Sequence, residues 1–430
     1  MSDLFFDFFS FQNPNVRYVV LGSVLLSISS AIVGCFTFLK KKALIGDVVS
    51  HAVLPGICLS FILTGTKNPF YLIIGAFFTG WLSIVILDYI VKHSKIKEDT
   101  ATGISLSVFF GLGILLLTVI QHSGNANQTG LDSFLFGKAA ALVGQDLIAF
   151  ASIAIIILII VFLFYKEFKL IAFDQEYASS LGIPVRVFDL LLTSITVMAV
   201  VTGIQAVGVV LMAAMLITPA AAARFWTDRL SIMLVLAAIF GAISGITGAF
   251  ISYTTPSMPT GPWIVMIVSI IAVASFFMAP EKGIIIKHLK QRRIRSQLLE
   301  ENLLKAFYQM GEAADSFKDS RTHDELSEMR RFKSGQLSKG LNRLKKNGFI
   351  NYSNGEWKLT KVGFDKGKRV IRLHRLWELY LTKYLKIAPD HVHEDADTIE
   401  HVITPELETR LKKLLEYPEQ DPHDSAIPYD

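Results

Sequence analysis

The order of hydrophobic and polar positions divides the chain into two parts. Residues 1–280 consist mainly of apolar runs separated by short polar stretches, and each run has the roughly 17–25 residues that a helix needs to cross a bilayer. The runs lie near residues 19–39, 43–64, 71–91, 101–121, 148–165, 187–204, 206–223, 231–253 and 263–279. The run at 206–223 is the weakest because Pro219 interrupts it. The pattern predicts an all-α polytopic membrane domain with eight to nine transmembrane helices.

The distribution of charge supports the same division. Residues 1–280 contain 14 of the 42 Lys and Arg and 13 of the 37 Asp and Glu. The first part is therefore too apolar for a soluble domain, whereas residues 281–430 have an ordinary soluble composition. We expect a transmembrane domain at 1–280, a basic juxtamembrane linker at 281–296, and two tail domains at 297–369 and 370–430.

Lysine and arginine also predict the orientation in the membrane. The loops at 40–42, 92–97, 166–186 and 224–229 lie on one side and together hold 11 Lys and Arg, whereas the other side holds only Arg17, Lys67 and Lys138. Because cytoplasmic loops are enriched in these residues, we expect the N-terminus outside and the tail in the cytoplasm. The basic cluster at 287–295 is expected at an anionic leaflet surface, or as a solvated helix exit.

The second apolar run, KKKALIGDVVSHAVLPG, contains two ionisable residues. Asp47 and His51 are four residues apart and so lie on one face of a helix. Ionisable groups inside a membrane are candidates for function, and a carboxylate with an imidazole suits Mn²⁺, Fe²⁺ or Zn²⁺. The following Pro55-Gly56 is expected to weaken the helix and free backbone carbonyls. An ion pair or a hydrogen-bonded pair would explain the spacing equally well, so the spacing alone leaves both interpretations open.

The stretch ALIGDVVSHAVLPG resembles the signature of the zinc/manganese/iron family of ABC-transporter permeases. IKEDTATGI (96–104) and GVVLMAAMLITPAAAARFWTDRL (208–230) resemble further parts of that family, in the same order. The resemblance implies a non-enzymatic, multi-pass subunit of a metal importer in the bacterial inner membrane, with Asp47 and His51 contacting the transported ion. The implied partners are a second permease copy or paralogue, a cytoplasmic ATPase and an extracellular metal-binding protein. An exporter is disfavoured only by this resemblance.

ATP hydrolysis is expected on a separate subunit, because the chain has no G-x-x-x-x-G-K-[ST] motif for an ATP site. The stretch FDQEYASSLGIPVR (173–186) predicts a short helix that ends at Gly182, with Pro184 preventing its continuation. In similar permeases this loop docks into the ATPase. The candidate coupling positions are Asp174, Glu176, Ala178, Leu181 and Gly182. An ordinary amphipathic connector is the alternative interpretation.

The first tail domain reads as three helices followed by a hairpin. Thr322-x-x-Glu325 is a helix-capping pattern, and Asn354-Gly355 between two β-like runs predicts a tight turn. The pattern is that of a winged helix-turn-helix, with residues 334–346 as the recognition helix. The candidate nucleic-acid contacts are Lys333, Lys339, Arg343, Lys345 and Lys346. Winged helices also bind proteins, so DNA is one of two classes of partner for this domain.

The last domain carries residues of the types that bind metal ions. RLHRLWELYL supplies His374 and Glu378, and HVHEDADTIEHVITPELETRL supplies His393, Asp397, Glu400 and His401. On a helix, the residues of the second group line one stripe. We interpret the composition as a regulatory metal site, although a solvated acidic face would account for single members.

Residues 297–428 resemble the diphtheria-toxin-repressor-like metalloregulators, with DPHDSAIP (421–428) resembling their closing stretch. The resemblance implies a helical metal-binding and dimerisation domain. Asp397, Glu400 and His401 match one metal site of that family, and His374, Glu378 and His393 match a second or shared one. One departure concerns the first helix, where Asn302 is a weak ligand and protonated Lys305 would repel a cation. Asp397 stands where some relatives have a thiolate, and ligands that are only N and O favour Mn²⁺ or Fe²⁺.

Two functional hypotheses follow. The first is a permease subunit of an ABC importer for Mn²⁺, Fe²⁺ or Zn²⁺ with a metal-sensing regulatory tail. The second is a membrane-tethered, metal-dependent transcription regulator whose membrane part is a vestigial anchor. The Asp47/His51 pair and the predicted coupling loop favour the first.

Overall fold

The fold is that of a computed structural model, which describes residues 2–66, 68–122, 144–255, 258–329, 334–387 and 403–429. The chain forms two compact units, residues 1–287 and 288–430. Each is described by itself below.

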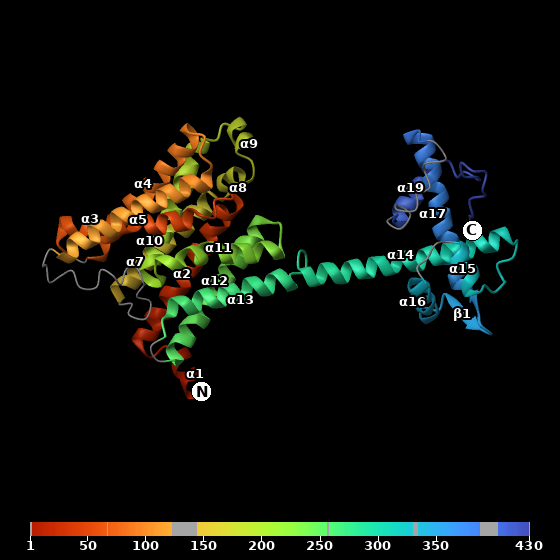
Figure 1. The fold of residues 1–430 in the computed structure, drawn as a ribbon, viewed down its shortest axis with the longest axis horizontal. Coiled ribbons are helices and arrows are strands. Elements are labelled where there is room, and N and C mark those ends of the chain that lie inside the picture. The colour runs from red at the N-terminus through yellow and green to blue at the C-terminus, as the bar shows by residue number, and fades with distance from the viewer. Residues whose placement is uncertain are drawn as a thin grey trace. The chain divides into compact units, whose positions relative to one another are not determined.

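The first unit consists of packed helices (Figure 1). Its helices are, in chain order, α1 (Ser2–Phe9), α2 (Pro14–Leu39), α3 (Ile45–Thr64), α4 (Pro69–His93), α5 (Glu98–His122), α7 (Gly144–Leu163), α8 (Tyr165–Phe173), α9 (Gln175–Ser180), α10 (Val185–Val207), α11 (Val209–Trp226), α12 (Leu230–Thr254) and α13 (Thr260–Met278).

Within the described ranges, seven helices are long and apolar enough to cross a membrane. An eighth span results if α7 and α8, which meet at a bend of 73°, are counted as one. The predicted segment at 206–223 corresponds to the shorter apolar helix α11, which contains Pro219 and is separated from α10 by Gly208. The prediction of an all-α polytopic membrane domain is therefore confirmed.

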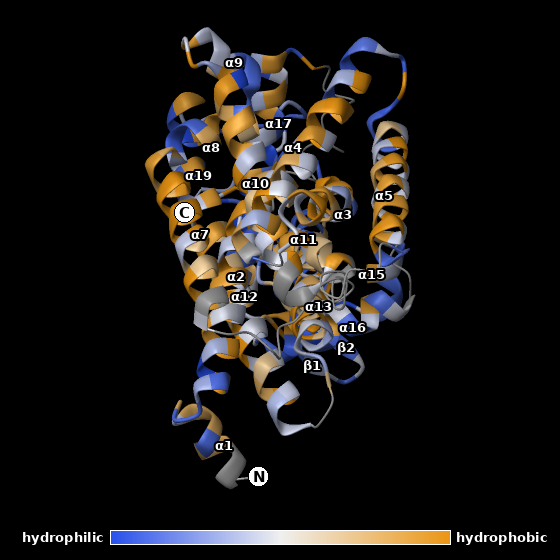
Figure 2. Cartoon of the chain, turned by 90° about the vertical axis from the view of Figure 1, so that its left-hand side faces the viewer, coloured by the Kyte–Doolittle hydropathy of each residue, from blue (hydrophilic) through white to orange (hydrophobic). Residues whose placement is uncertain are grey.

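The helices differ in how much of their surface the unit itself covers. In α3, 78% of the most apolar stretch is buried, compared with 28% in α5 and 22% in α13. α5 and α7 are coloured hydrophobic along most of their length in Figure 2. Apolar side chains on the outside of a helix bundle are stable against lipid tails, whereas α3 is enclosed by protein. The pair Asp47 and His51 thus lies on the most enclosed span.

Glycines allow α3 and α4 to pack closely. A Cβ atom at Gly56 would overlap the carbonyl oxygen of Gly75 and the hydroxyl of Thr79, and one at Gly75 would overlap the carbonyl oxygen of Gly56. Small residues at such a contact bring helix backbones together, which strengthens van der Waals packing within a membrane. Pro55-Gly56 does not end the helix, since α3 continues to Thr64, and Gly56 serves this contact.

The second unit contains the predicted helices and hairpin. Its elements are α14 (Ile284–Ala313, from His288 onward), α15 (His323–Met329), α16 (Ser334–Lys346), β1 (Ile350–Ser353), β2 (Glu356–Leu359), α17 (Lys361–Leu385) and α19 (Pro405–Leu414). The Thr322 hydroxyl accepts the Glu325 N–H at 3.3 Å, and the Glu325 carboxylate accepts the Thr322 N–H at 2.9 Å. This is the predicted capping box.

A two-stranded antiparallel sheet forms the wing. β1 pairs with β2 so that Ser353 faces Glu356, and Asn354 and Gly355 between them have φ of 54° and 85°. Positive φ at both positions is the requirement of a type I′ turn, which explains the Asn-Gly sequence. Leu337, Leu341 and Leu344 of α16 are buried in the core of this domain, together with Ile350 and Trp357.

Candidate functional site

His51 has a buried nitrogen that nothing satisfies within the described part of the chain. Its Nδ1 has no hydrogen-bond partner there, and neither has the Oγ of the adjacent Ser50. The imidazole stands edge-on to the ring of Phe110 in α5, with 5.0 Å between the ring centroids. Buried polar atoms nearly always have partners, so the Nδ1 of His51 is a candidate contact for a bound ion or water.

Pro55 also changes the backbone hydrogen bonding of α3, one turn after His51. Pro55 lies inside α3 and has no N–H, so the carbonyl of His51, four residues earlier, lacks its usual donor in the helix. Asp47 lies one turn before His51, in the first turn of α3, where the helix dipole favours a negative charge. Carboxylate, imidazole and carbonyl together are suitable donors for a divalent cation of the first transition series.

The site on one chain is incomplete. Among the described residues, no three His, Cys, Asp or Glu side chains come together to hold a metal ion. As candidate ligands, Asp47 and His51 would supply two side chains, whereas Zn²⁺ takes four ligands. A cation stopping here would need water or further ligands from elsewhere.

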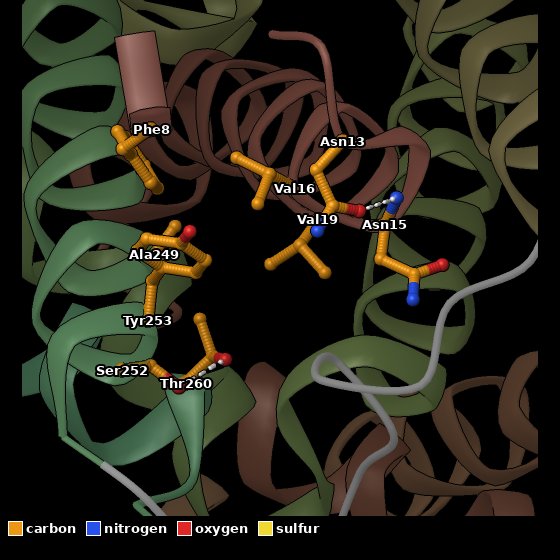
Figure 3. Close-up of a pocket in the computed structure, with 9 residues that line it drawn as sticks. All are labelled: Phe8, Asn13, Asn15, Val16, Val19, Ala249, Ser252, Tyr253 and Thr260. Carbon is orange, nitrogen blue, oxygen red and sulfur yellow. Dashed lines mark hydrogen bonds between the residues drawn. The ribbon is translucent and has the colours of Figure 1, made fainter. Parts of the chain in front are cut away.

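A cavity of about 300 Å³ in the same unit lies apart from this pair. It lies between α1, α2, α12 and α13 and is lined by Phe8, Asn13, Asn15, Val16, Val19, Ala249, Ser252, Tyr253 and Thr260 (Figure 3). The Asn13 side chain accepts the N–H of Asn15 at 3.0 Å, and the Thr260 hydroxyl donates to Ser252 at 3.0 Å. Among the residues that the structure describes, no carboxylate or imidazole lines this cavity, so they offer a cation none of the ligand types of Asp47 and His51.

The short helix predicted within residues 173–186 is present as α9. Asp174 caps it by accepting the N–H of Tyr177 at 2.9 Å. Gly182, at φ 79°, donates to the Ser179 carbonyl, and Ile183 donates to that of Ala178. These two bonds form a Schellman motif, which ends the helix at the predicted glycine.

The side chains of this segment are not equally accessible. Glu176 and Leu181 are exposed, as is Tyr177, which the sequence analysis did not include. Ala178 is fully buried, so its selection as a contact position is wrong. The reason is the packing of α9 against α8 and α10, which takes up one side of this short helix. Tyr177 and Leu181 expose 54% and 57% of their surface, so apolar side chains are accessible at this segment.

Two ion pairs near the ends of the membrane helices were not predicted. Lys40, which follows α2, pairs with Asp189 in the first turns of α10, and the Lys40 side chain is only 7% exposed. Lys42 lies 3.4 Å from Asp88 of α4. The signal was available in the sequence, since Asp88 and Asp189 are acids inside predicted spans near loops rich in lysine.

In the tail, only part of the predicted metal cluster lies within the described residues. His393, Asp397, Glu400 and His401 lie outside them. His374 and Glu378 are both buried in α17, and their Nε2 and Oε1 atoms are 2.9 Å apart. The Nδ1 of His374 lies 2.8 Å from the Nζ of Lys305, in α14. With an ammonium group in contact with the imidazole, these residues do not fit a metal ion as they stand.

The predicted nucleic-acid contacts lie on α16, except Lys333, which lies outside the described residues. Lys339, Lys345 and Lys346 are exposed. Arg343 is bound within its own domain: its Nε lies 2.7 Å from the Glu300 carboxylate, and its guanidinium also donates to Ser296. This pairing offsets the Arg343 charge and makes its guanidinium less available to bind a nucleic-acid phosphate.

A buried charge network, which the sequence analysis missed, joins α17 to α19 and the C-terminal stretch. Glu408 accepts hydrogen bonds from Arg369 and Arg372 at 3.0 and 3.1 Å. Arg375 binds the Glu312 carboxylate at 2.6 and 2.9 Å and lies 3.5 Å from Asp421. Four of these residues are nearly fully buried, and pairing offsets the cost of removing their charges from water.

The fold is that of a polytopic membrane protein, and its most enclosed helix carries two candidate ligands for a cation, Asp47 and His51. Comparison with known proteins supports the same class of protein. The sequence model of the ABC 3 transport family matches residues 12–279, and the chain belongs to this family. Residues 360–429 match the model described as the iron dependent repressor, metal binding and dimerisation domain. Both resemblances inferred from the sequence are thus confirmed.

Among curated relatives, the manganese transport system membrane protein MntC of Bacillus subtilis is 41% identical over 406 residues, 94% of this chain and 92% of the relative. The zinc transport system membrane protein TroC of Treponema pallidum is 40% identical over 291 residues, 68% of this chain and 97% of the relative. Among solved structures, PsaBC from Streptococcus pneumoniae in complex with Fab covers 66% of this chain and 99% of its own, with a TM-score of 0.59 and 35% identity.

Proposed function

We propose that the chain is the permease subunit of an ABC importer for divalent transition-metal ions, Mn²⁺, Fe²⁺ or Zn²⁺. The observation that carries the proposal is the pair Asp47 and His51 on the most enclosed span, with the Nδ1 of His51 buried and lacking a partner among the described residues. Desolvating a divalent ion is costly unless protein donors replace its water, and a carboxylate and an imidazole do so. The relatives named for manganese and zinc transport support the same class of cargo.

The partners follow from what a single chain lacks. Two side-chain ligands are too few for a complete site, which supports a second permease copy or paralogue. The absence of a Walker motif from the sequence supports a separate ATPase, docked at the exposed residues of α9. An extracellular metal-binding protein would deliver the ion. The lysine and arginine distribution supports an orientation with the N-terminus outside and the tail in the cytoplasm. The bacterial membrane proteins among the relatives support the bacterial inner membrane.

The proposal is tested with the permease and its ATPase reconstituted in proteoliposomes, by measuring ATP-dependent uptake of Mn²⁺, Fe²⁺ and Zn²⁺. Asp47→Asn and His51→Gln are expected to lower uptake by more than about tenfold, because each removes a ligand of the ion on its path. His122→Gln and Asp99→Asn are matched controls, since both residues are exposed near the ends of α5. Unchanged uptake by both α3 variants would overturn the proposal.

For the tail we propose a regulatory role. The match of residues 360–429 to a metal-binding and dimerisation domain supports a response to cytoplasmic metal, with His393, Asp397, Glu400 and His401 as candidate ligands. Uptake into vesicles preloaded with metal tests it: preloading is expected to slow wild-type uptake. If Asp397→Ala/His401→Ala keeps the wild-type dependence on internal metal, the role is refuted.

A further inference from the structure

A buried lysine contacts the one histidine of the predicted metal cluster that the structure describes. Lys305 of α14 is 2% exposed, and His374 and Glu378 of α17 are 6% and 1% exposed. Lys305 Nζ lies 2.8 Å from His374 Nδ1, and His374 Nε2 lies 2.9 Å from Glu378 Oε1. The three groups therefore form a continuous chain in the interior of the second unit.

The chemistry of the groups fixes the direction of the hydrogen bond between Lys305 and His374. An ammonium group has three donors and no acceptor, so Lys305 donates and His374 Nδ1 accepts. A neutral imidazole that accepts at Nδ1 carries its proton on Nε2, which lies 2.9 Å from the Glu378 carboxylate. Nδ1 is thus occupied by Lys305, and Nε2 carries a proton close to Glu378. The positive charge of Lys305 is balanced by the negative charge of Glu378.

The packing of α14 against α17 keeps Lys305 in this position. A Cβ atom at Gly367 would lie 3.0 Å from the carbonyl oxygen of Leu304, so the two backbones pass close to each other next to Lys305. One turn on, Tyr308 stacks on Phe364 with 5.6 Å between ring centroids. Arg375 and Glu312 join the same helices by two hydrogen bonds. With contacts on both sides, the lysine cannot leave the imidazole without separating the helices.

The hydrogen bonding and the charge around His374 both disfavour the binding of a metal ion there. It needs a ring nitrogen with a free lone pair, but Nδ1 accepts from Lys305 and Nε2 carries the proton. It would also stand beside a buried ammonium group, and like charges at contact distance in a low dielectric repel strongly. We propose that the Lys305 ammonium is the permanent cation of this site. His374 and Glu378 then bind no metal ion, and the α14–α17 interface keeps its packing at any metal concentration.

Mn²⁺ binding to the full-length chain in detergent tests the proposal, with electron paramagnetic resonance used to count free and bound ions. His374→Gln is the informative variant, because its amide can accept from Lys305 and donate to Glu378 but is a poor ligand. We expect it to bind the same number of Mn²⁺ ions as wild type. Fewer bound ions, or affinity weaker by more than about tenfold, would show that His374 is a ligand and would overturn the proposal.

Lys305→Glu is the positive control. It exchanges the ammonium for a carboxylate beside His374 and Glu378, which makes a group of three metal ligands. We expect it to bind one Mn²⁺ more per chain than wild type, and Lys305→Glu/His374→Gln to lose that ion. This pair of variants shows that the measurement detects an ion at this position.

Hydrogen exchange provides a second readout on the same full-length protein. Peptides covering residues 299–308 and 370–381 are expected to exchange equally with Mn²⁺ and with a chelator in the wild type. Lys305→Met removes the ammonium group that contacts His374 in the buried interface, so exchange in both peptides should rise more than about tenfold, with or without Mn²⁺. Slower wild-type exchange in these peptides on adding Mn²⁺ would overturn the proposal. Neither readout involves transport, so the result is independent of the proposed function.

Discussion

Lys40, just after α2, forms an ion pair with Asp189 in the first turns of α10. α10 begins at Val185, directly after the segment of α9 proposed to contact the ATPase. The pair therefore joins that segment to a helix that packs in the centre of the membrane unit. Its lysine is almost fully buried, so removing either partner leaves a charge without compensation away from water.

We predict that Lys40→Met destabilises the protein by about 1–3 kcal/mol, because it leaves the Asp189 carboxylate without its partner in a partly buried position. Lys42→Met is the matched control, since Lys42 and Asp88 are 3.4 Å apart and more exposed, and its expected effect is about 0–1 kcal/mol. Unfolding of the detergent-solubilised protein measures both. The double variant Lys40→Asp/Asp189→Lys should recover part of the loss, and no recovery would argue against a specific pair.

The close contact of α3 with α4 gives a second prediction. Gly56→Ala places a methyl group against the carbonyl oxygen of Gly75, so the two helices must separate. We expect a loss of about 1–3 kcal/mol, measured as a lower melting temperature in detergent, together with reduced metal uptake. Gly111→Ala in α5 is the control: nothing lies within 4 Å of the added atom, so the variant should be neutral or slightly more stable.

A third prediction concerns the exposed apolar residues of α9. Leu181→Ser and Tyr177→Ala are each expected to weaken ATPase binding by about tenfold, as removal of a central apolar contact commonly does. The measurement is binding of the purified ATPase to the permease in nanodiscs, by surface plasmon resonance. Ser179→Ala, an exposed change on the same helix, should leave binding unchanged. Equal affinity of all three variants and wild type would place the ATPase contact elsewhere.

Much of the fold could be predicted because its signals are local. The capping of α15 by Thr322 and Glu325, and the turn at Asn354-Gly355, each depend on residues within a few positions of one another. The apolar runs predict the membrane helices for a similar reason, since a span is a property of one segment.

The tertiary contacts of the candidate site residues could not be predicted from local sequence signals. Lys305 was recognised from the sequence as unfavourable for a metal ion, but its partner His374 is 69 positions away and depends on how α14 packs on α17. Ala178 was chosen from its position in a short helix, and its burial depends on the neighbouring helices. Pairing between distant helices follows from tertiary packing, which a single sequence does not display.

The charge network around Glu408 leads to a prediction about pH. Burial raises the pKa of this carboxyl, but hydrogen bonds from Lys412 and Arg369 and the charge of Arg372 outweigh it, so the pKa is lower than usual. A carboxyl whose pKa is lower in the folded state stabilises the fold above its unfolded pKa. This contribution is lost as the pH falls through the lowered pKa, because protonated Glu408 no longer balances its cationic neighbours.

Hydrogen exchange of the full-length protein checks this prediction in peptides covering α19. At neutral pH, Glu408→Gln should exchange faster than wild type, because the nearly buried Arg372 loses its charged partner. Comparing the two proteins at the same pH cancels the intrinsic exchange rate, so their difference reports Glu408 alone. The difference should shrink steadily as the pH is lowered below the usual range for a glutamate. Glu406→Gln, an exposed change in the same helix turn, should match wild type at every pH. If the difference in exchange rate between Glu408→Gln and wild type stays the same at acidic pH, the prediction is wrong. In that case the packing of the Glu408 side chain, and not its charge, stabilises α19.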